Sequence, residues 1–193
     1  AGKLASRNSP AYWDTTKEKT ESQYKLFQKF DSFEAADYQE LALYCTERGL
    51  DFLSTPFDSD AVDMLAPLVP VFKVASADIT NVPLLRKIAQ FDKPVIMSTG
   101  MATVEEVEAA VNAANSAGVF ELEILHCVSN YPAAIESLNL SAIKTLRDRF
   151  RVDVGWSDHT NSDYAVLASV LKWGAKTVEM HIDLDGDGEE VGP

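Results

Sequence analysis

Val152-Asp-Val-Gly-Trp-Ser-Asp-His159 is a short apolar run that ends in ionisable residues, and Thr177-Val-Glu-Met-His181 repeats this pattern further along the chain. Four similar runs precede them, at residues 51–56, 71–76, 94–100 and 123–130. Short apolar runs separated by amphipathic helical stretches are typical of parallel strands that alternate with helices. In such folds the chemistry collects where the strands end. The pattern therefore predicts an α/β domain with a candidate site at one rim of its sheet.

The six runs predict about six strand and helix units, which is too few to close an eight-stranded barrel. A complete (β/α)8 TIM barrel usually takes about 250 residues, whereas this chain has 193, of which 46% are hydrophobic. We therefore expect one domain with the architecture of an incomplete TIM barrel. In the clearest helical segment, Thr103 is a candidate N-cap and Gly118 a candidate stop. The expected helices span residues 21–30, 33–48, 84–91, 104–115 and 164–172.

Composition narrows the range of partners. The formal net charge of -13 argues against nucleic acid, because nonspecific binding to polyanions needs many Lys and Arg contacts. A small anionic ligand remains compatible, since backbone amides, hydroxyls and one or two lysines can build a local anion site. Cys45 and Cys127 show no disulfide framework, which favours a reducing interior. We find neither a signal peptide nor an apolar run long enough to span a membrane, so we expect a cytoplasmic protein with no membrane partner.

Two histidines, His159 and His181, end consecutive predicted strands. Neighbouring parallel strands would place both rings within reach of one ion. Two imidazoles leave positions open for water and a substrate oxygen, which suits a divalent ion in a catalytic role. Asp158 and Glu179 are candidate carboxylates behind these ligands. Hydrogen-bonded histidines and solvated acids at the rim are the alternative interpretation, and the residues alone leave both open.

Lys73 lies inside the apolar run Val71-Phe-Lys-Val74, where an ammonium group is costly unless an anion meets it. It is a candidate Schiff-base nucleophile or a candidate binder of phosphate or carboxylate. A lysine that reaches outward between helices is the third interpretation. Hydroxyl groups at nearby strand ends would suit a phosphate, unless they only cap the following helices. They belong to Ser76, Ser98, Thr99 and Ser157.

A series of short motifs runs through most of the chain in one order. They include Ser54-Thr-Pro-Phe-Asp58, Phe72-Lys-Val-Ala-Ser76, Lys93-Pro-Val-Ile-Met-Ser-Thr-Gly-Met101, Ser129-Asn-Tyr-Pro132, Ser157-Asp-His-Thr160 and Glu179-Met-His181. Together they resemble the sialic acid synthase family, which includes N-acetylneuraminate, legionaminate and pseudaminate synthases and a spore-coat polysaccharide homologue. The resemblance covers residues from about 33 to 184.

The resemblance implies an enzyme that condenses phosphoenolpyruvate with an N-acylated amino sugar, such as N-acetylmannosamine, to a nine-carbon 2-keto sugar acid and phosphate. Lys73 would then be an electrostatic anchor, with Asp78 as the second catalytic candidate. Tyr131 would face the sugar. His159 and His181 would bind a divalent metal, Mn²⁺ first, with Mg²⁺ or Co²⁺ as alternatives. The phosphoenolpyruvate site would be lined by Thr55, Ser76, Ser98, Asn130 and Ser157.

The chain also departs from the family pattern. Many members have Ser-Gly-Glu where this chain has Ser76-Ala-Asp78, so its carboxylate is one methylene shorter, which favours altered sugar choice. The resemblance implies that the six runs correspond to strands 3 to 8 of the barrel. It also implies that residues 1–193 are a partial synthase domain, without the first two strands, the closing helix and the C-terminal antifreeze-like domain. It implies a homodimer for the intact protein and little or no activity for these residues alone. The alternatives are a sister synthase that uses a sugar phosphate, a metal-dependent barrel aldolase, and a noncatalytic sugar-binding relative.

Overall fold

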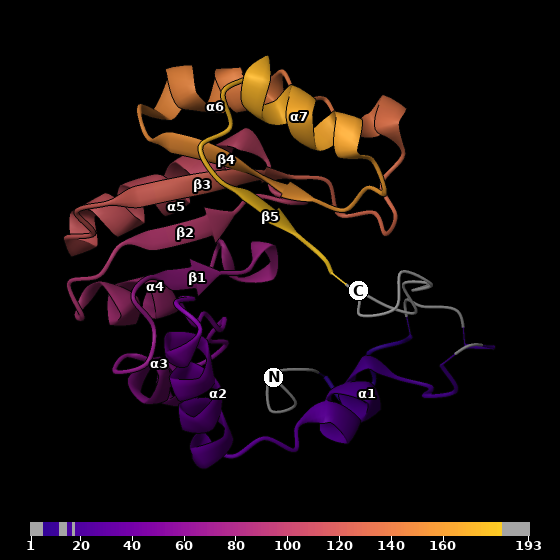
Figure 1. Ribbon diagram of the computed structural model, residues 1–193, viewed down its shortest axis with the longest axis vertical. Helices are drawn as coiled ribbons and strands as arrows, with labels where there is room; N and C mark the ends of the chain where they lie inside the picture. Colours follow the sequence, from indigo (N-terminus) through magenta and orange to yellow (C-terminus); the bar gives the residue numbers. More distant parts are fainter. Residues whose placement is uncertain (1–5, 12–14, 17, 183–193) are drawn as a thin grey trace.

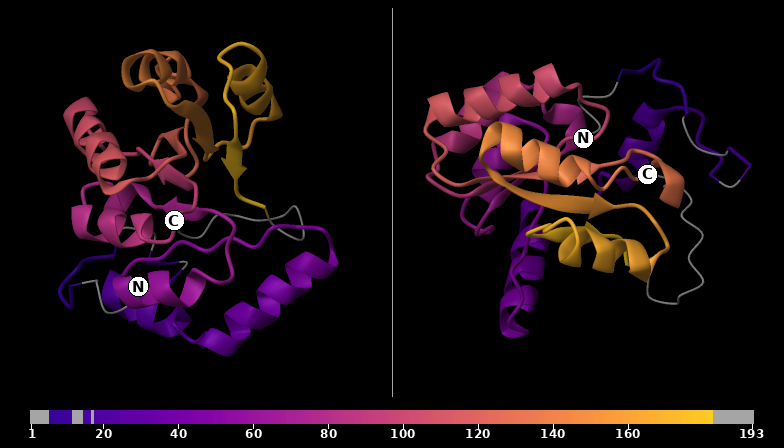
Figure 2. Two further views of the ribbon diagram at one scale, coloured as in Figure 1. Left: turned by 90° about the vertical axis from the view of Figure 1, so that its left-hand side faces the viewer. Right: turned by 90° about the horizontal axis from the view of Figure 1, so that it is seen from above.

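Five parallel strands form the centre of the computed structural model, which describes residues 6–11, 15–16 and 18–182 (Figure 1). The strands lie side by side in chain order: β1 (Phe72–Val74), β2 (Val95–Ser98), β3 (Leu122–Cys127), β4 (Asp153–Asp158) and β5 (Val178–Met180). The connecting helices are α4 (Val82–Ala89), α5 (Val104–Ala117), α6 (Ala142–Phe150) and α7 (Asp163–Leu171). They surround the outside of a curled sheet (Figure 2). This arrangement confirms the expected α/β architecture of an incomplete barrel.

Three helices precede the sheet: α1 (Gln23–Phe30), α2 (Ala35–Glu47) and α3 (Ser59–Leu65). Short 3-10 turns follow β1 at Ser76–Asp78 (η1) and β3 at Ile135–Ser137 (η2). The five expected helices all form, with ends that differ by a few residues, whereas α3 and α6 lie outside the expected set. Thr103 caps α5 in a reciprocal capping box with Glu106, and Gly118 ends it at a φ of 96°. Both predicted helix boundaries are therefore confirmed.

The first of the six predicted strands does not form. Residues 51–57 have no regular secondary structure, and β1 pairs only with β2. The run has few residues before Pro56, which has no backbone N–H to donate to a strand ladder. Phe52 still packs against the core. The run therefore contributes apolar contacts, and the sheet has five strands where six were expected.

Alternation along the strands separates the core from the candidate site. Successive side chains of a strand point to opposite faces. On β1, Phe72 and Val74 are fully buried in the core between sheet and helices, so Lys73 between them points to the inner, concave face. The same parity places Val154 and Trp156 of β4 in the core and Ser157 on the inner face. The inner face therefore collects the polar residues that the strand ends supply.

Membrane insertion through a helix has no support in the part of the chain that the structure describes. None of its helices combines the length and the apolar character that crossing a bilayer requires.

Candidate active site

Lys73 meets a carboxylate that comes from the opposite edge of the sheet. Its Nζ lies 3.1 Å from Oε1 of Glu179 on β5, and its side chain is 14% exposed. The second oxygen of Glu179, Oε2, accepts a hydrogen bond of 2.6 Å from the Ser157 hydroxyl on β4. A lysine that pairs with an acid inside the curl of the sheet does not reach outward between helices. The structure therefore rules out the third interpretation of Lys73.

The Glu179 carboxyl is held in its ionised form. Burial raises its pKa, but the positive charge of Lys73 and the hydrogen bonds from Ser157 and Lys73 outweigh burial and hold the pKa below its ordinary value. Glu179 and Lys73 therefore carry opposite charges at neutral pH. The charge of the lysine, which would attract an anionic ligand, is already balanced by a neighbour.

Further hydroxyl groups lie at the ends of β1 and β2. Ser76 opens η1, and its Oγ accepts a hydrogen bond of 3.0 Å from the N–H of Gly100, just after β2. Ser98 is 3% exposed, and its Oγ has no hydrogen-bond partner among the described residues. A buried hydroxyl without a partner is costly, and a bound ligand oxygen would satisfy it. The Thr99 hydroxyl is already used, because it donates to the carbonyl of Leu125 at 2.9 Å.

Gly100 is a point of close approach between three segments. A Cβ placed on it would lie 2.4 Å from Oγ of Ser129 and 3.0 Å from both Sγ of Cys127 and Oγ of Ser76. The absence of a side chain therefore lets the polar ends of these segments meet above β2. Glycine is required here by space.

Three rings meet at the ends of β4 and β5. The ring centroid of Tyr131 lies 4.0 Å from that of His159, in a stacked arrangement, and 5.7 Å from that of His181. The two histidine centroids are 5.4 Å apart. The prediction that consecutive strands would bring both histidines together is therefore confirmed, and Tyr131 joins them.

The orientation of His159 fits a metal ligand. Its Nδ1 lies 2.7 Å from the carbonyl oxygen of Val128, and because a carbonyl can only accept, Nδ1 carries the proton. Nε2, 3.4 Å from Oγ of Ser157, then keeps a lone pair that can coordinate an ion. A hydrogen bond of this kind fixes the tautomer of many metal-binding histidines. Within the described ranges, no group of three or more His, Cys, Asp or Glu side chains is arranged to hold a metal, so this centre offers two imidazoles.

Asp78 and Asn130 lie at the rim with less specific surroundings. Asp78 is half-buried in η1, and its Oδ1 accepts a hydrogen bond of 3.2 Å from the amide of Asn81, the N-cap of α4. Its carboxylate is thus partly occupied in starting that helix. Asn130 is exposed directly before Tyr131. Neither position contradicts the predicted roles, and neither establishes them.

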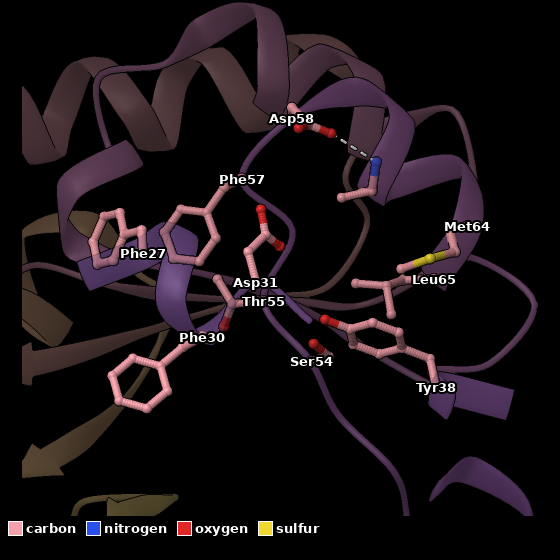
Figure 3. Close-up of a pocket in the computed structure, with 11 residues that line it drawn as sticks. Phe27, Phe30, Asp31, Tyr38, Ser54, Thr55, Phe57, Asp58, Met64 and Leu65 are labelled. Atoms are coloured by element: carbon pink, nitrogen blue, oxygen red, sulfur yellow. Dashed lines mark hydrogen bonds between the residues drawn. The ribbon is translucent and has the colours of Figure 1, made fainter. Parts of the chain in front are cut away.

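Thr55 lines a different cavity from the Lys73 cluster. It faces a pocket of about 340 Å³ enclosed by α1, α2, α3 and the segment between α2 and α3 (Figure 3). Aromatic rings form much of its wall, including Phe27, Phe57 and Tyr38, with Asp31 beside them. Lys73, Ser76, Ser98 and Ser157 are not among the lining residues. Thr55 therefore lines a pocket of its own, and its part in the Lys73 site stays a prediction.

Three residues make more contacts at this site than the sequence patterns predict. The sequence patterns predict Glu179 only as an acid behind the metal ligands, and they include Gly100 and Ser129 only as parts of motifs. Side-chain alternation offers a signal for Glu179, because it lies two residues before His181 and therefore shares its face. The close approach of Gly100 and Ser129 depends on the packing of two loops, which has no local signature.

Comparison with known proteins places the chain among carbohydrate synthases. A sequence profile described as the NeuB family matches residues 1–191. The chain is 42% identical over 168 residues to N,N'-diacetyllegionaminic acid synthase of Campylobacter jejuni. The aligned region covers 86% of this chain and 50% of that protein. It is 35% identical over 184 residues to pseudaminic acid synthase of Helicobacter pylori, covering 94% and 53%. The chain spans about half the length of the curated relatives it matches.

Solved structures agree with this comparison. The N-acetylneuraminic acid synthetase of Leptospira borgpetersenii, crystallised with citrate, superposes with a TM-score of 0.75 at 34% identity, over 79% of this chain and 53% of that one. A truncated 3-deoxy-D-arabino-heptulosonate 7-phosphate synthase of Thermotoga maritima gives a TM-score of 0.71 at 15% identity, over 82% and 64%. The second likeness concerns the fold alone.

Proposed function

We propose a function from one premise: this chain belongs to the NeuB family. The protein that contains it condenses phosphoenolpyruvate with an N-acylated amino sugar, forms a carbon–carbon bond and releases phosphate. The observation that carries this proposal is a chain of contacts on the inner face of the sheet: Glu179 binds Lys73 and Ser157, and Ser157 adjoins His159, whose ring lies beside that of His181. An anion site beside a metal site suits a reaction between an anionic enol and a sugar carbonyl.

Lys73 is proposed to hold phosphoenolpyruvate by its charge. Its ammonium group, together with the hydroxyls of Ser76, Ser98 and Ser157, offers donors to the oxygens of a phosphate or carboxylate. The buried Ser98 hydroxyl, for which the described residues offer no partner, supports this role most directly. Lys73 pairs with the Glu179 carboxylate at 3.1 Å, the arrangement of an electrostatic anchor, whereas a Schiff-base lysine must react as the free amine. The geometry thus favours the synthase over a barrel aldolase.

The two histidines are proposed to hold a divalent ion, Mn²⁺ first, with Mg²⁺ or Co²⁺ as alternatives. Nε2 of His159 is available because Nδ1 is bound to the Val128 carbonyl, and the His181 ring lies close enough to share the ion. Such an ion would polarise the sugar carbonyl as a Lewis acid. Tyr131, stacked on His159, would face the sugar and orient it, and Asn130 would contribute an amide to phosphoenolpyruvate.

The choice of sugar is the finer question. Relatives include synthases of legionaminic acid and of pseudaminic acid, and the proposed substrate class is the N-acylated amino sugar common to such products. Asp78 is proposed to contact the sugar from η1, where its shorter side chain alters the fit. Thr55 would contribute from the neighbouring pocket. We propose a cytoplasmic homodimer for the whole protein, in which residues 1–193 are part of a barrel domain.

The proposal is tested by assaying the full-length protein with Mn²⁺, phosphoenolpyruvate and a panel of N-acylated amino sugars and their phosphates. Release of inorganic phosphate, with a nine-carbon keto acid detected by mass spectrometry, is the expected result. Lys73→Met should abolish both signals, whereas Glu40→Gln, on the exposed side of α2, should change neither. Release of pyruvate without phosphate would identify an aldolase instead, and binding of sugar without any product would identify a noncatalytic relative.

A further inference from the structure

Glu179 binds Lys73 and Ser157, two residues that are proposed to hold an anionic ligand. Its Oε1 lies 3.1 Å from Nζ of Lys73 and its Oε2 2.6 Å from Oγ of Ser157. Two oxygens of one negatively charged group therefore take the ammonium and the hydroxyl at once. Two oxygens of a phosphate would use the same donors in the same way.

The same contact makes Glu179 a competitor for those donors. A phosphate that approaches Lys73 must either displace the Glu179 carboxylate or bind while the negative charge of Glu179 stays close by. Both cost binding free energy. The Glu179 side chain is 42% exposed and the lysine 14%. The acid therefore has room to move aside toward solvent, whereas the lysine is held in place.

We propose that Glu179 is an internal competitor that lowers the affinity of this site for phosphate, so that the phosphate product leaves readily. This inference rests on the proposed function only in naming phosphate as the product. Glu179 acts through Lys73 and Ser157 and is a positioning residue. It keeps both groups oriented when no ligand is bound, and it prevents a simple anion from staying bound to them.

The test measures binding of inorganic phosphate to the full-length protein by isothermal titration calorimetry, with a chelator present so that metal phosphate complexes do not contribute. Glu179→Gln keeps the shape of the side chain and removes its charge. We expect this variant to bind phosphate at least about tenfold more tightly than the wild type. Its affinity should also fall more steeply with salt, because Lys73 would no longer be neutralised.

Two controls make the result specific. Glu40→Gln removes one negative charge from an exposed position on α2, and it should leave phosphate affinity unchanged. Lys73→Met should abolish phosphate binding, alone and combined with Glu179→Gln. A purely structural role for Glu179 predicts weaker binding in Glu179→Gln, because Lys73 and Ser157 would lose their orientation.

Equal or weaker phosphate affinity in Glu179→Gln overturns the inference, and so does the absence of measurable binding in both proteins. Failure of the proposed function is a separate result, seen as no phosphate release from phosphoenolpyruvate and any amino sugar. That result would leave the comparison of phosphate affinities intact. Circular dichroism of each variant confirms that the fold is retained.

Discussion

Lys73 and Glu179 form an ion pair of 3.1 Å although their strands, β1 and β5, lie at opposite edges of the five-stranded sheet. The contact is possible because the sheet curls, so that the inner faces of its first and last strands approach each other (Figure 1). The pair is therefore a link across the concave side of the barrel. It joins residues that are more than one hundred positions apart in the chain.

This link should contribute measurably to stability. In a double-mutant cycle of Lys73→Met and Glu179→Gln, we expect a coupling free energy of about 1 kcal/mol, the upper range for an exposed pair, because the lysine is half-buried and the acid is partly solvated. Urea unfolding of the four proteins measures it. The exposed pair Lys144 and Asp148, four residues apart on α6, serves as the control and should give a clearly smaller coupling, because water and salt screen both of its charges. A coupling of zero for Lys73 and Glu179 would show that the pair does not stabilise the fold.

Gly100→Ala should destabilise the protein by about 2 kcal/mol, as overpacking of a filled site does. The new Cβ would lie 2.4 Å from Oγ of Ser129, so one of the two segments has to move. Thermal or urea unfolding measures the loss. The second substitution Ser129→Ala removes the clashing oxygen and should restore at least half of the lost stability. If the double variant is no more stable than Gly100→Ala, the close contact is not the cause.

The strands that the sequence predicts correctly are those whose apolar residues face the helices. Phe72 and Val74, for example, mark β1 because their burial follows from local alternation. The run at residues 51–56 looks similar but does not pair, because strand formation requires a hydrogen-bonding neighbour as well as apolar residues. Whether such a neighbour exists is a property of the whole sheet.

The contacts of the candidate site could likewise be predicted from the sequence only in part. The meeting of His159 and His181 could be predicted, because consecutive parallel strands end at one rim. The pairing of Lys73 with Glu179 could not, because it depends on how strongly the sheet curls. Thr55 lines the pocket between α1, α2 and α3, and its part in the Lys73 site stays a prediction.

Metal affinity should depend on the two rim histidines. His159→Ala and His181→Ala should each weaken Mn²⁺ binding by at least about 100-fold, since loss of a direct ligand exceeds the 10–100-fold effect of losing an outer hydrogen bond. Calorimetry with Mn²⁺ alone measures this without any turnover. His126→Gln is the matched control: the His126 ring bonds the Leu138 carbonyl at 2.7 Å, away from the ring cluster, so Mn²⁺ affinity should not change. Equal loss in all three variants would indicate a general effect on folding.

Glu123 should make the protein less stable as the pH rises. Burial raises the pKa of its carboxyl, against the opposing hydrogen bond from Thr177, and Oε1 has no partner among the described residues. The folded state therefore binds a proton more tightly than the unfolded state. Its stabilising effect is complete below the ordinary value of 4.5 and is lost as the pH rises through the folded pKa.

The measurement is the free energy of unfolding of the wild type and of Glu123→Gln from pH 4 to pH 8. Because the other titrating groups are common to both proteins, their difference isolates this carboxyl. We expect the wild type to lose stability relative to Glu123→Gln as the pH rises. Glu121→Gln, at an exposed position two residues away, should show no such trend. A difference that stays flat, or that favours the wild type at high pH, would mean that Glu123 is solvated in solution.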